Sequence, residues 1–302
     1  MSGMMALDVT AAAGAVGDLA LKGTLVLAVA GLAALALRRA SASARHLAWA
    51  LGFGGLLALP VLGLALPSWR LPILPAEPVP AATAVSAEPL REMKTADAAR
   101  SIVHTPSRPS AAPQPAEPIR TAAPAADARG WRWDVLGGLA VAAWMLGAAL
   151  ALLRLATSVT RVRREGRTAR PLADGPVAEL RDRLVWRMGI DRPVRLLEGA
   201  PGCMPLTWGI VRPCVLLPAD TEAWPADRLE AVLTHELAHV RRRDCAWQLV
   251  AEAACALHWF NPLAWAAARR MRLESEHACD DQVLIAGSRG ADYAGHLLDV
   301  AR

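Results

Sequence analysis

The sequence predicts a mainly α-helical membrane protein, with three N-terminal transmembrane helices followed by a cytosolic α+β domain that contains a small sheet. The chain is 54% hydrophobic, which is high for a purely soluble protein. Three long apolar runs lie in its first half, and arginines or prolines separate them. From residue 171 onward, short strand-like and helix-like segments carry many charges instead.

The first two apolar runs are predicted to form a transmembrane hairpin over residues 19–66. Residues 19–37 and 47–66 contain one charged side chain between them, Lys22. As helices rising 1.5 Å per residue, each is about 30 Å long, which matches the hydrocarbon core of a bilayer. Residues 1–18 contain no Lys or Arg, so we expect them to be an N-terminal extracytoplasmic segment.

A proline-rich segment and a third apolar run follow. Residues 67–130 hold more than half of the 22 prolines and are expected to form a Pro/Ala-rich, disordered extracytoplasmic loop. Residues 135–153 contain no charge and are predicted as the third transmembrane helix, with a cluster of arginines directly behind it. By the positive-inside rule, this multi-pass protein of the inner (cytoplasmic) membrane keeps everything after residue 154 in the cytosol.

Charge and cysteine usage agree with this topology. The net charge of +5 comes from arginines beside the apolar runs, so lipid head groups are the expected partners and direct nucleic-acid binding is not expected. All five cysteines lie in the predicted cytosolic part without C-x-x-C spacing, which favours buried thiols in a reducing compartment. A homodimer is left open.

Residues 171–302 are predicted as the cytosolic domain, and they contain the motif His235-Glu236-Leu237-Ala238-His239. Positions i and i+4 of a helix share a face, so His235 and His239 can bind one Zn²⁺ while Glu236 acts as the general base. This pattern predicts a zincin-like zinc metalloendopeptidase. The alternative is a helix that happens to carry two surface histidines. Residues 194–197 are predicted as a strand, and residues 205–210 and 214–217 as a hairpin.

A third metal ligand is expected from a later helix. Catalytic zinc usually has three protein ligands, but Arg242 and Cys245 occupy the positions where a metzincin has glycine and histidine. The spacing leaves several candidates open: Glu252, Glu274, Glu276, Asp280, Asp281, His258 and His277. Glu276 and Asp280 share a helix face, so one can bind metal while the other orients a ligand histidine.

Residues 246–265 are apolar enough to suggest a fourth membrane span. A single crossing would place Glu276 on the opposite side of the membrane from His235, and no shared metal site could form. We therefore interpret this stretch as a helical hairpin that turns at Asn261 and Pro262 and does not cross the bilayer.

Two further roles are predicted for short segments. Thr207, Trp208 and Gly209 read either as an edge strand that pairs with an extended substrate or as an ordinary sheet edge. Tyr293 and His296 read either as donors to an oxyanion or as plain helix surface.

Five sequence blocks, taken together, resemble the BlaR/MecR-like antirepressor family of integral-membrane zinc metallopeptidases. The blocks are residues 204–209 (MPLTWG), 215–218 (VLLP), 235–244 (HELAHVRRRD), 258–263 (HWFNPL) and 276–281 (EHACDD). The resemblance implies a gluzincin-type site with His235, His239 and Glu276 as zinc ligands, Glu236 as general base and Asp280 behind the ligands. It also implies a peptidase that cleaves a protein substrate, a helix-turn-helix repressor, in response to an extracytoplasmic signal.

Some functional alternatives stay open at this level. The family's receptors continue into another transmembrane helix and a penicillin-binding sensor, so residues 171–302 are expected to be truncated at the C-terminus and β-lactam sensing does not follow from the sequence. A non-catalytic transducer with a structural zinc site is a second interpretation. A general membrane-protein quality-control metallopeptidase is a third.

Overall fold

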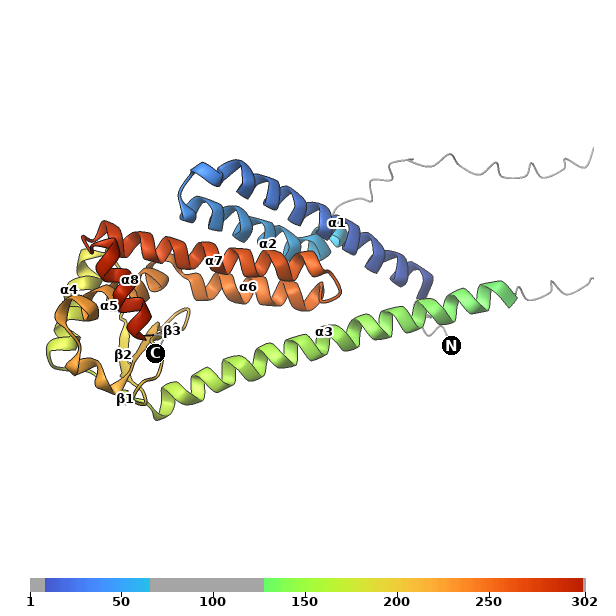
Figure 1. Ribbon diagram of the computed structural model, residues 1–302. Helices are drawn as coiled ribbons and strands as arrows, with labels where there is room; N and C mark the ends of the chain where they lie inside the picture. Colours follow the sequence, from blue (N-terminus) through green and yellow to red (C-terminus); the bar gives the residue numbers. More distant parts are fainter. Residues whose placement is uncertain (1–8, 66–127, 301–302) are drawn as a thin grey trace, which may run out of the picture. The chain divides into compact units, whose positions relative to one another are not determined.

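The structure is a computed structural model that describes residues 9–65 and 128–300 (Figure 1). Within these ranges the chain is mostly helical and has one small sheet, as the sequence predicts. The loop predicted at 67–130 lies outside the described residues up to residue 127, and so do the first eight residues of the predicted N-terminal segment.

Three helices are long and apolar enough to cross a membrane: α1 (Val9–Ala36), α2 (Ala42–Ala65) and α3 (Ala128–Thr168). Two of them are longer than the sequence suggests. Helix α1 begins at Val9 rather than at residue 19, within a stretch rich in alanine, the best helix former. Helix α3 continues beyond residue 153 to Thr168, because its arginine-rich extension contains no proline.

Helices α6 (Asp244–Leu257) and α7 (Pro262–Ile285) form the predicted hairpin and contact each other (Figure 1). The Asn261 side chain caps α7 by accepting a 3.0 Å hydrogen bond from the Leu263 N–H, and Pro262 occupies its first turn. This hairpin shares one apolar core with the first two membrane helices. Buried side chains of that core include Leu27 of α1, Phe53 of α2, Cys255 of α6 and Met271 of α7.

The sheet has the strand order β1-β2-β4-β3. The predicted hairpin is present, with β3 (Leu206–Trp208) antiparallel to β4 (Cys214–Leu217), while β2 (Arg195–Glu198) runs parallel to β4. Gly209 at the start of the turn has φ +98°, and a Cβ there would lie 2.5 Å from the Arg212 carbonyl oxygen, so only glycine fits. The remaining strand, β1 (Arg170–Pro171), pairs with β2 and leaves β3 at the opposite edge.

One face of the sheet is covered by α4 (Pro176–Arg187) and α5 (Ala226–Arg242). Their apolar sides share a core with the strands; Leu184 of α4, Val215 of β4 and Leu237 of α5 are each 1% exposed or less. The turns η1 (Leu37–Arg39) and η2 (Ala219–Ala223) are single 3₁₀ turns, and α8 (Gly290–Val300) closes the described chain. This packing fixes α5, which carries the H-E-x-x-H motif.

Candidate metal centre

Helix α5 presents both motif histidines on one side. It begins after Pro225 and has a strongly apolar face against the sheet, so the histidines at positions i and i+4 point away from that core. The side chains of His235 and His239 are 16% and 12% exposed. Glu236 lies between them on the helix and is buried. The helix therefore holds two imidazoles and one carboxylate where little of each side chain is exposed to solvent.

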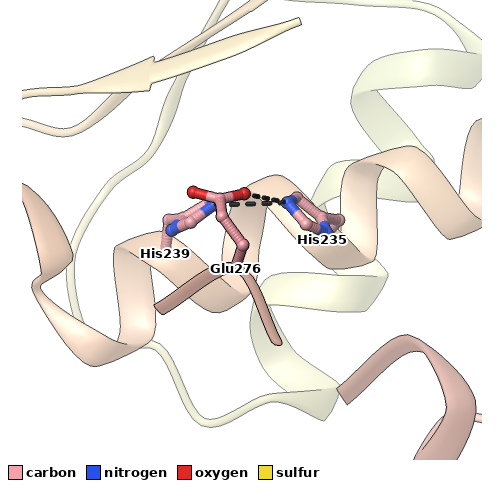
Figure 2. Close-up of side chains that lie close together, drawn as sticks. All are labelled: His235, His239 and Glu276. Atoms are coloured by element: carbon pink, nitrogen blue, oxygen red, sulfur yellow. Dashed lines mark hydrogen bonds and ion pairs between the residues drawn. The ribbon is translucent and has the colours of Figure 1, made fainter. Parts of the chain in front are cut away.

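Helix α7 brings Glu276 to these two histidines (Figure 2). The two Nε2 atoms of His235 and His239 are 3.3 Å apart. Glu276 Oε2 lies 3.5 Å from Nε2 of His235 and 3.8 Å from Nε2 of His239. Ligand atoms placed tetrahedrally at about 2.0–2.1 Å from Zn²⁺ are roughly 3.3–3.4 Å apart. The distance between the two histidines matches this spacing, and the two distances to Glu276 are slightly longer.

A buried carboxylate orients His239 from behind. The Nδ1 atom of His239 donates to Asp244 Oδ2 at 2.9 Å, and Asp244 is 1% exposed. The pKa of Asp244 would be raised by burial, but the hydrogen bond from His239 and the charge of Arg242 outweigh that effect and lower it. Because Nδ1 is occupied in this way, Nε2 is the nitrogen left for metal.

The Asp244 carboxylate reaches His239 because the chain turns sharply at Arg243. Its φ of +59° is the one left-handed backbone conformation of a non-glycine residue in the described chain. The corner ends α5 and starts α6 at Asp244, so the chain folds back under His239. Such a conformation is uncommon for arginine and costs on the order of 1 kcal/mol, which the packing around it must offset.

A second pair of side chains orients His235. Its Nδ1 lies 3.1 Å from Asp280 Oδ1 and 3.0 Å from the Tyr293 hydroxyl, which in turn donates to Asp280 at 2.7 Å. Asp280 therefore lies on the Nδ1 side of His235, and its predicted role behind a metal ligand stays a prediction. The Tyr293 hydroxyl contacts the far side of His235, away from Glu276, and its predicted oxyanion role stays a prediction. The side chain of His296 lies outside the described residues.

The carboxylates also shift the pKa of His235. Burial by itself lowers that pKa, but Asp280, Glu276 and Glu236 together overcome burial and raise it to about 10. The hydrogen bond from His235 lowers the pKa of Glu276 in return. Without metal, a proton therefore balances this acidic cluster, and a divalent cation would replace it.

The edge strand β3 positions the predicted general base. The hydroxyl of Thr207 donates to Glu236 Oε2 at 2.6 Å. The thiol of Cys245 on α6 approaches the backbone carbonyl of Thr207 at 3.5 Å. Trp208, the next residue, packs toward Gly166 of α3, where an added Cβ would lie 2.4 Å from the indole ring. Of the three predicted edge residues, Thr207 therefore lies next to the candidate general base, Trp208 packs against α3 and Gly209 begins the turn.

The other candidate ligands lie elsewhere. Glu252 pairs with Arg272 at 3.1 Å within the hairpin, and Glu274 pairs with Arg45 of α2 at 2.7 Å. His277 is 60% exposed beside Glu274. His258 is fully buried in the hairpin turn, and Asp281 is exposed. None of them belongs to a cluster of metal-ligating atoms among the described residues.

Three contributions to the site were not predicted. Asp244 was not assigned a role, although its position two residues past the end of the motif helix was a usable signal. The hydroxyl of Thr207 acts on Glu236, which no spacing reveals. Cys279 lies 3.4 Å from His239 and forms a second group with His239 and Asp244. Burial and the nearby Asp244 charge raise the pKa of the Cys279 thiol, which argues against a thiolate ligand there.

Comparisons with known proteins agree with this geometry. The family described as BlaR1 peptidase M56 matches residues 16–302. The regulatory protein BlaR1 of Bacillus licheniformis is 30% identical over 146 residues, which are 47% of this chain and 24% of that protein. The chain thus spans about a quarter of the length of that curated relative. The resemblance carried by the five sequence blocks is confirmed.

Proposed function

Because the chain belongs to the BlaR1 peptidase M56 family, we propose that it is a membrane-embedded zinc endopeptidase that acts in regulated proteolysis. Its substrate would be a cytosolic transcriptional repressor, cleaved in response to an extracytoplasmic signal. The observation that carries this proposal is the convergence of His235, His239 and Glu276, with Glu236 buried beside them. A peptidase needs both the metal ligands and the base.

The donor set suits zinc, since two imidazoles and one carboxylate form a common catalytic zinc site with an open fourth position. A zinc ion held by His235, His239 and Glu276 would polarise the scissile carbonyl and lower the pKa of water at the site. His277 is the nearest additional histidine on α7, but it is exposed and beside Glu274. This placement supports an open, catalytic site over a closed, structural one.

The chain's own residues account for the proton transfers. Glu236 accepts a hydrogen bond from Thr207 on Oε2, which leaves Oε1 to take the proton from the attacking water. The same carboxyl group then passes that proton to the leaving amine. Asp244 and Asp280 hold the two imidazoles in the tautomer that exposes Nε2.

The substrate would lie along β3. Within the described sheet this strand is hydrogen-bonded to β4 alone, so its other edge can accept an extended peptide by β-augmentation. The Thr207 carbonyl on this strand has only a weak thiol donor, Cys245, which a substrate amide would replace. Pairing there brings the substrate next to Glu236.

The proposed orientation places this peptidase part in the cytosol. The corner between α1 and α2 is basic, and it contacts the peptidase part directly. Arg45 pairs with Glu274 at 2.7 Å, and Arg242 donates to the Ser43 hydroxyl at 2.6 Å. The corner and the metal centre therefore lie on the same side, and the positive-inside rule favours the cytosol for it.

The test is the variant Glu236→Ala in the full chain, reconstituted in lipid nanodiscs. We expect it to bind one zinc per chain and to lose roughly 10²–10⁴-fold in the cleavage rate of a peptide library read by mass spectrometry. Glu230→Ala is the matched control, because Glu230 lies on the same helix and pairs with Arg187 outside the site. Cleavage by Glu236→Ala at the wild-type rate would show that the proposed mechanism is wrong.

A further inference from the structure

A large cleft of about 1690 Å³ lies between α3, α6 and β3. Its walls include the α3 segment around Gly166, the α6 side chains Cys245 and Glu252, and the strand residues Leu206 to Gly209. Thr207 belongs both to this cleft and to the metal centre, because its hydroxyl is bonded to Glu236. Through Thr207, the cleft therefore borders the residue that holds the candidate general base.

The cytosolic part of this cleft is strongly basic. Its lining includes five arginines that form no ion pair with a carboxylate in the part of the chain that the structure describes. They are Arg154, Arg163 and Arg167 of α3, Arg195 of β2, and Arg212 in the turn between β3 and β4. Among the described lining residues the acidic one is Glu252, and Arg272 already neutralises it at 3.1 Å.

Membrane topology does not account for all of this charge. The positive-inside bias applies within about 15–20 residues of the end of a transmembrane segment. It explains the arginines of the α3 extension, but Arg195 and Arg212 belong to the sheet and lie much further along the chain. Two separate parts of the sequence thus converge to place unpaired positive charge beside one strand edge.

We propose that this cleft binds an acidic, extended segment of the substrate protein. The segment's backbone would pair with β3, and its Asp or Glu side chains would reach Arg195, Arg212 and the arginines of α3. This inference rests on the proposed peptidase function and adds the chemical class of the sequence that it accepts. An arginine guanidinium suits this task, because it binds carboxylates in a bidentate manner.

The test compares two peptides of the same sequence length, one with Asp and Glu at the flanking positions and one with Asn and Gln instead. The full chain in nanodiscs should cleave the acidic peptide with a higher kcat/KM, and raising the salt should reduce the difference. Arg195→Gln and Arg212→Gln should each lower kcat/KM roughly 1.5- to 5-fold for the acidic peptide, the range of an exposed ion pair. Neither variant should affect the neutral peptide.

Arg161→Gln and Arg164→Gln are matched controls, since both residues lie on the same extension of α3 but do not line the cleft. Equal kcat/KM for the two peptides would overturn the inference. The inference would also be overturned if the Arg195→Gln and Arg212→Gln proteins lost affinity only for anionic lipid vesicles, because that result would identify a lipid site.

Binding separates this inference from the proposed function. The Glu236→Gln protein is titrated with both peptides by fluorescence anisotropy. Preferential binding of the acidic peptide, with no cleavage of either peptide by the wild-type chain, would support the cleft and contradict the peptidase. Cleavage of both peptides without preferential binding would contradict the cleft and support the peptidase.

Discussion

The candidate metal centre has two halves that hold their histidines in different ways. In the buried half, His239 is backed by Asp244, which is 1% exposed and follows it by five residues. In the outer half, His235 is backed by Asp280, which is 34% exposed and comes from α7, with Tyr293 of α8 behind it. One half is built within a short stretch of chain, and the other is assembled from distant helices.

The two halves also differ in the helices that support them. The buried half is tied to the membrane helices, because His46 of α2 lies 3.8 Å from Asp244 and Arg242 contacts both Asp244 and Ser43. The outer half depends on how α8 docks. We therefore expect substitutions in the buried half to weaken zinc binding more than substitutions in the outer half.

The largest predicted effect is on the buried half. Asp244→Asn should weaken zinc binding about 100-fold, which is the upper end of the range for losing a carboxylate that orients a ligand histidine. We expect the upper end because the substitution also removes a buried negative charge and leaves Arg242 without its carboxylate partner. Competition with a chromogenic chelator in nanodiscs measures this. A loss smaller than that of Asp280→Asn would reverse the comparison.

A smaller effect is predicted for the outer half. Asp280→Asn should weaken zinc binding about 10-fold, since its carboxylate is partly screened by solvent. Tyr293→Phe removes one hydroxyl that contacts both His235 and Asp280, and it should weaken binding less than Asp280→Asn does. The same chelator assay reads both variants, and Asp281→Asn on the exposed side of α7 serves as control. Equal losses for Asp281→Asn and Asp280→Asn would show that only net charge matters.

The last predicted effect concerns pH. In the metal-free protein the pKa of His235 is raised from 6.5 to about 10, so the folded state binds this proton more tightly than the unfolded state does. The resulting stability is fully present below pH 6.5 and is lost as pH rises through 10. Between pH 7 and pH 10, Tm should fall more steeply than in His235→Gln, because each kcal/mol of lost stability lowers Tm by about 2–4 °C. Tryptophan fluorescence with chelator present measures it, and identical slopes would remove His235 as the cause.

The membrane helices and the motif could be predicted because they depend on local composition and spacing. The apolar run at residues 135–153 and the i, i+4 pair of His235 and His239 need no tertiary information. The choice among seven candidate residues did need it, since the register of α7 against α5 decides which side chain lies beside the two histidines. The family resemblance indicated Glu276, whose Oε2 lies 3.5 Å and 3.8 Å from the two Nε2 atoms, and its role as a metal ligand stays a prediction.

Other features depend on conformations that local patterns do not encode. Asp244 reaches His239 only because Arg243 adopts a left-handed conformation that arginine rarely takes. Strand β1 has two residues, Arg170 and Pro171, and is too short for any periodicity. The hydrogen bond from Thr207 to Glu236 joins residues 29 positions apart through the packing of β3 on α5.

The apolar core shared by α1, α2 and the α6–α7 hairpin has a thermodynamic consequence. Two of the three candidate ligand atoms belong to α5 and the third to α7, whose first half packs against the membrane helices. A slide of α7 by one helical turn, about 5.4 Å, would carry Glu276 out of reach of both imidazoles. Zinc occupancy and the register of the membrane bundle would then be linked reciprocally, so that each shifts the other's equilibrium by the same free energy. Zinc binding would then stabilise one register of the membrane bundle, and a change in that register would alter the affinity for zinc.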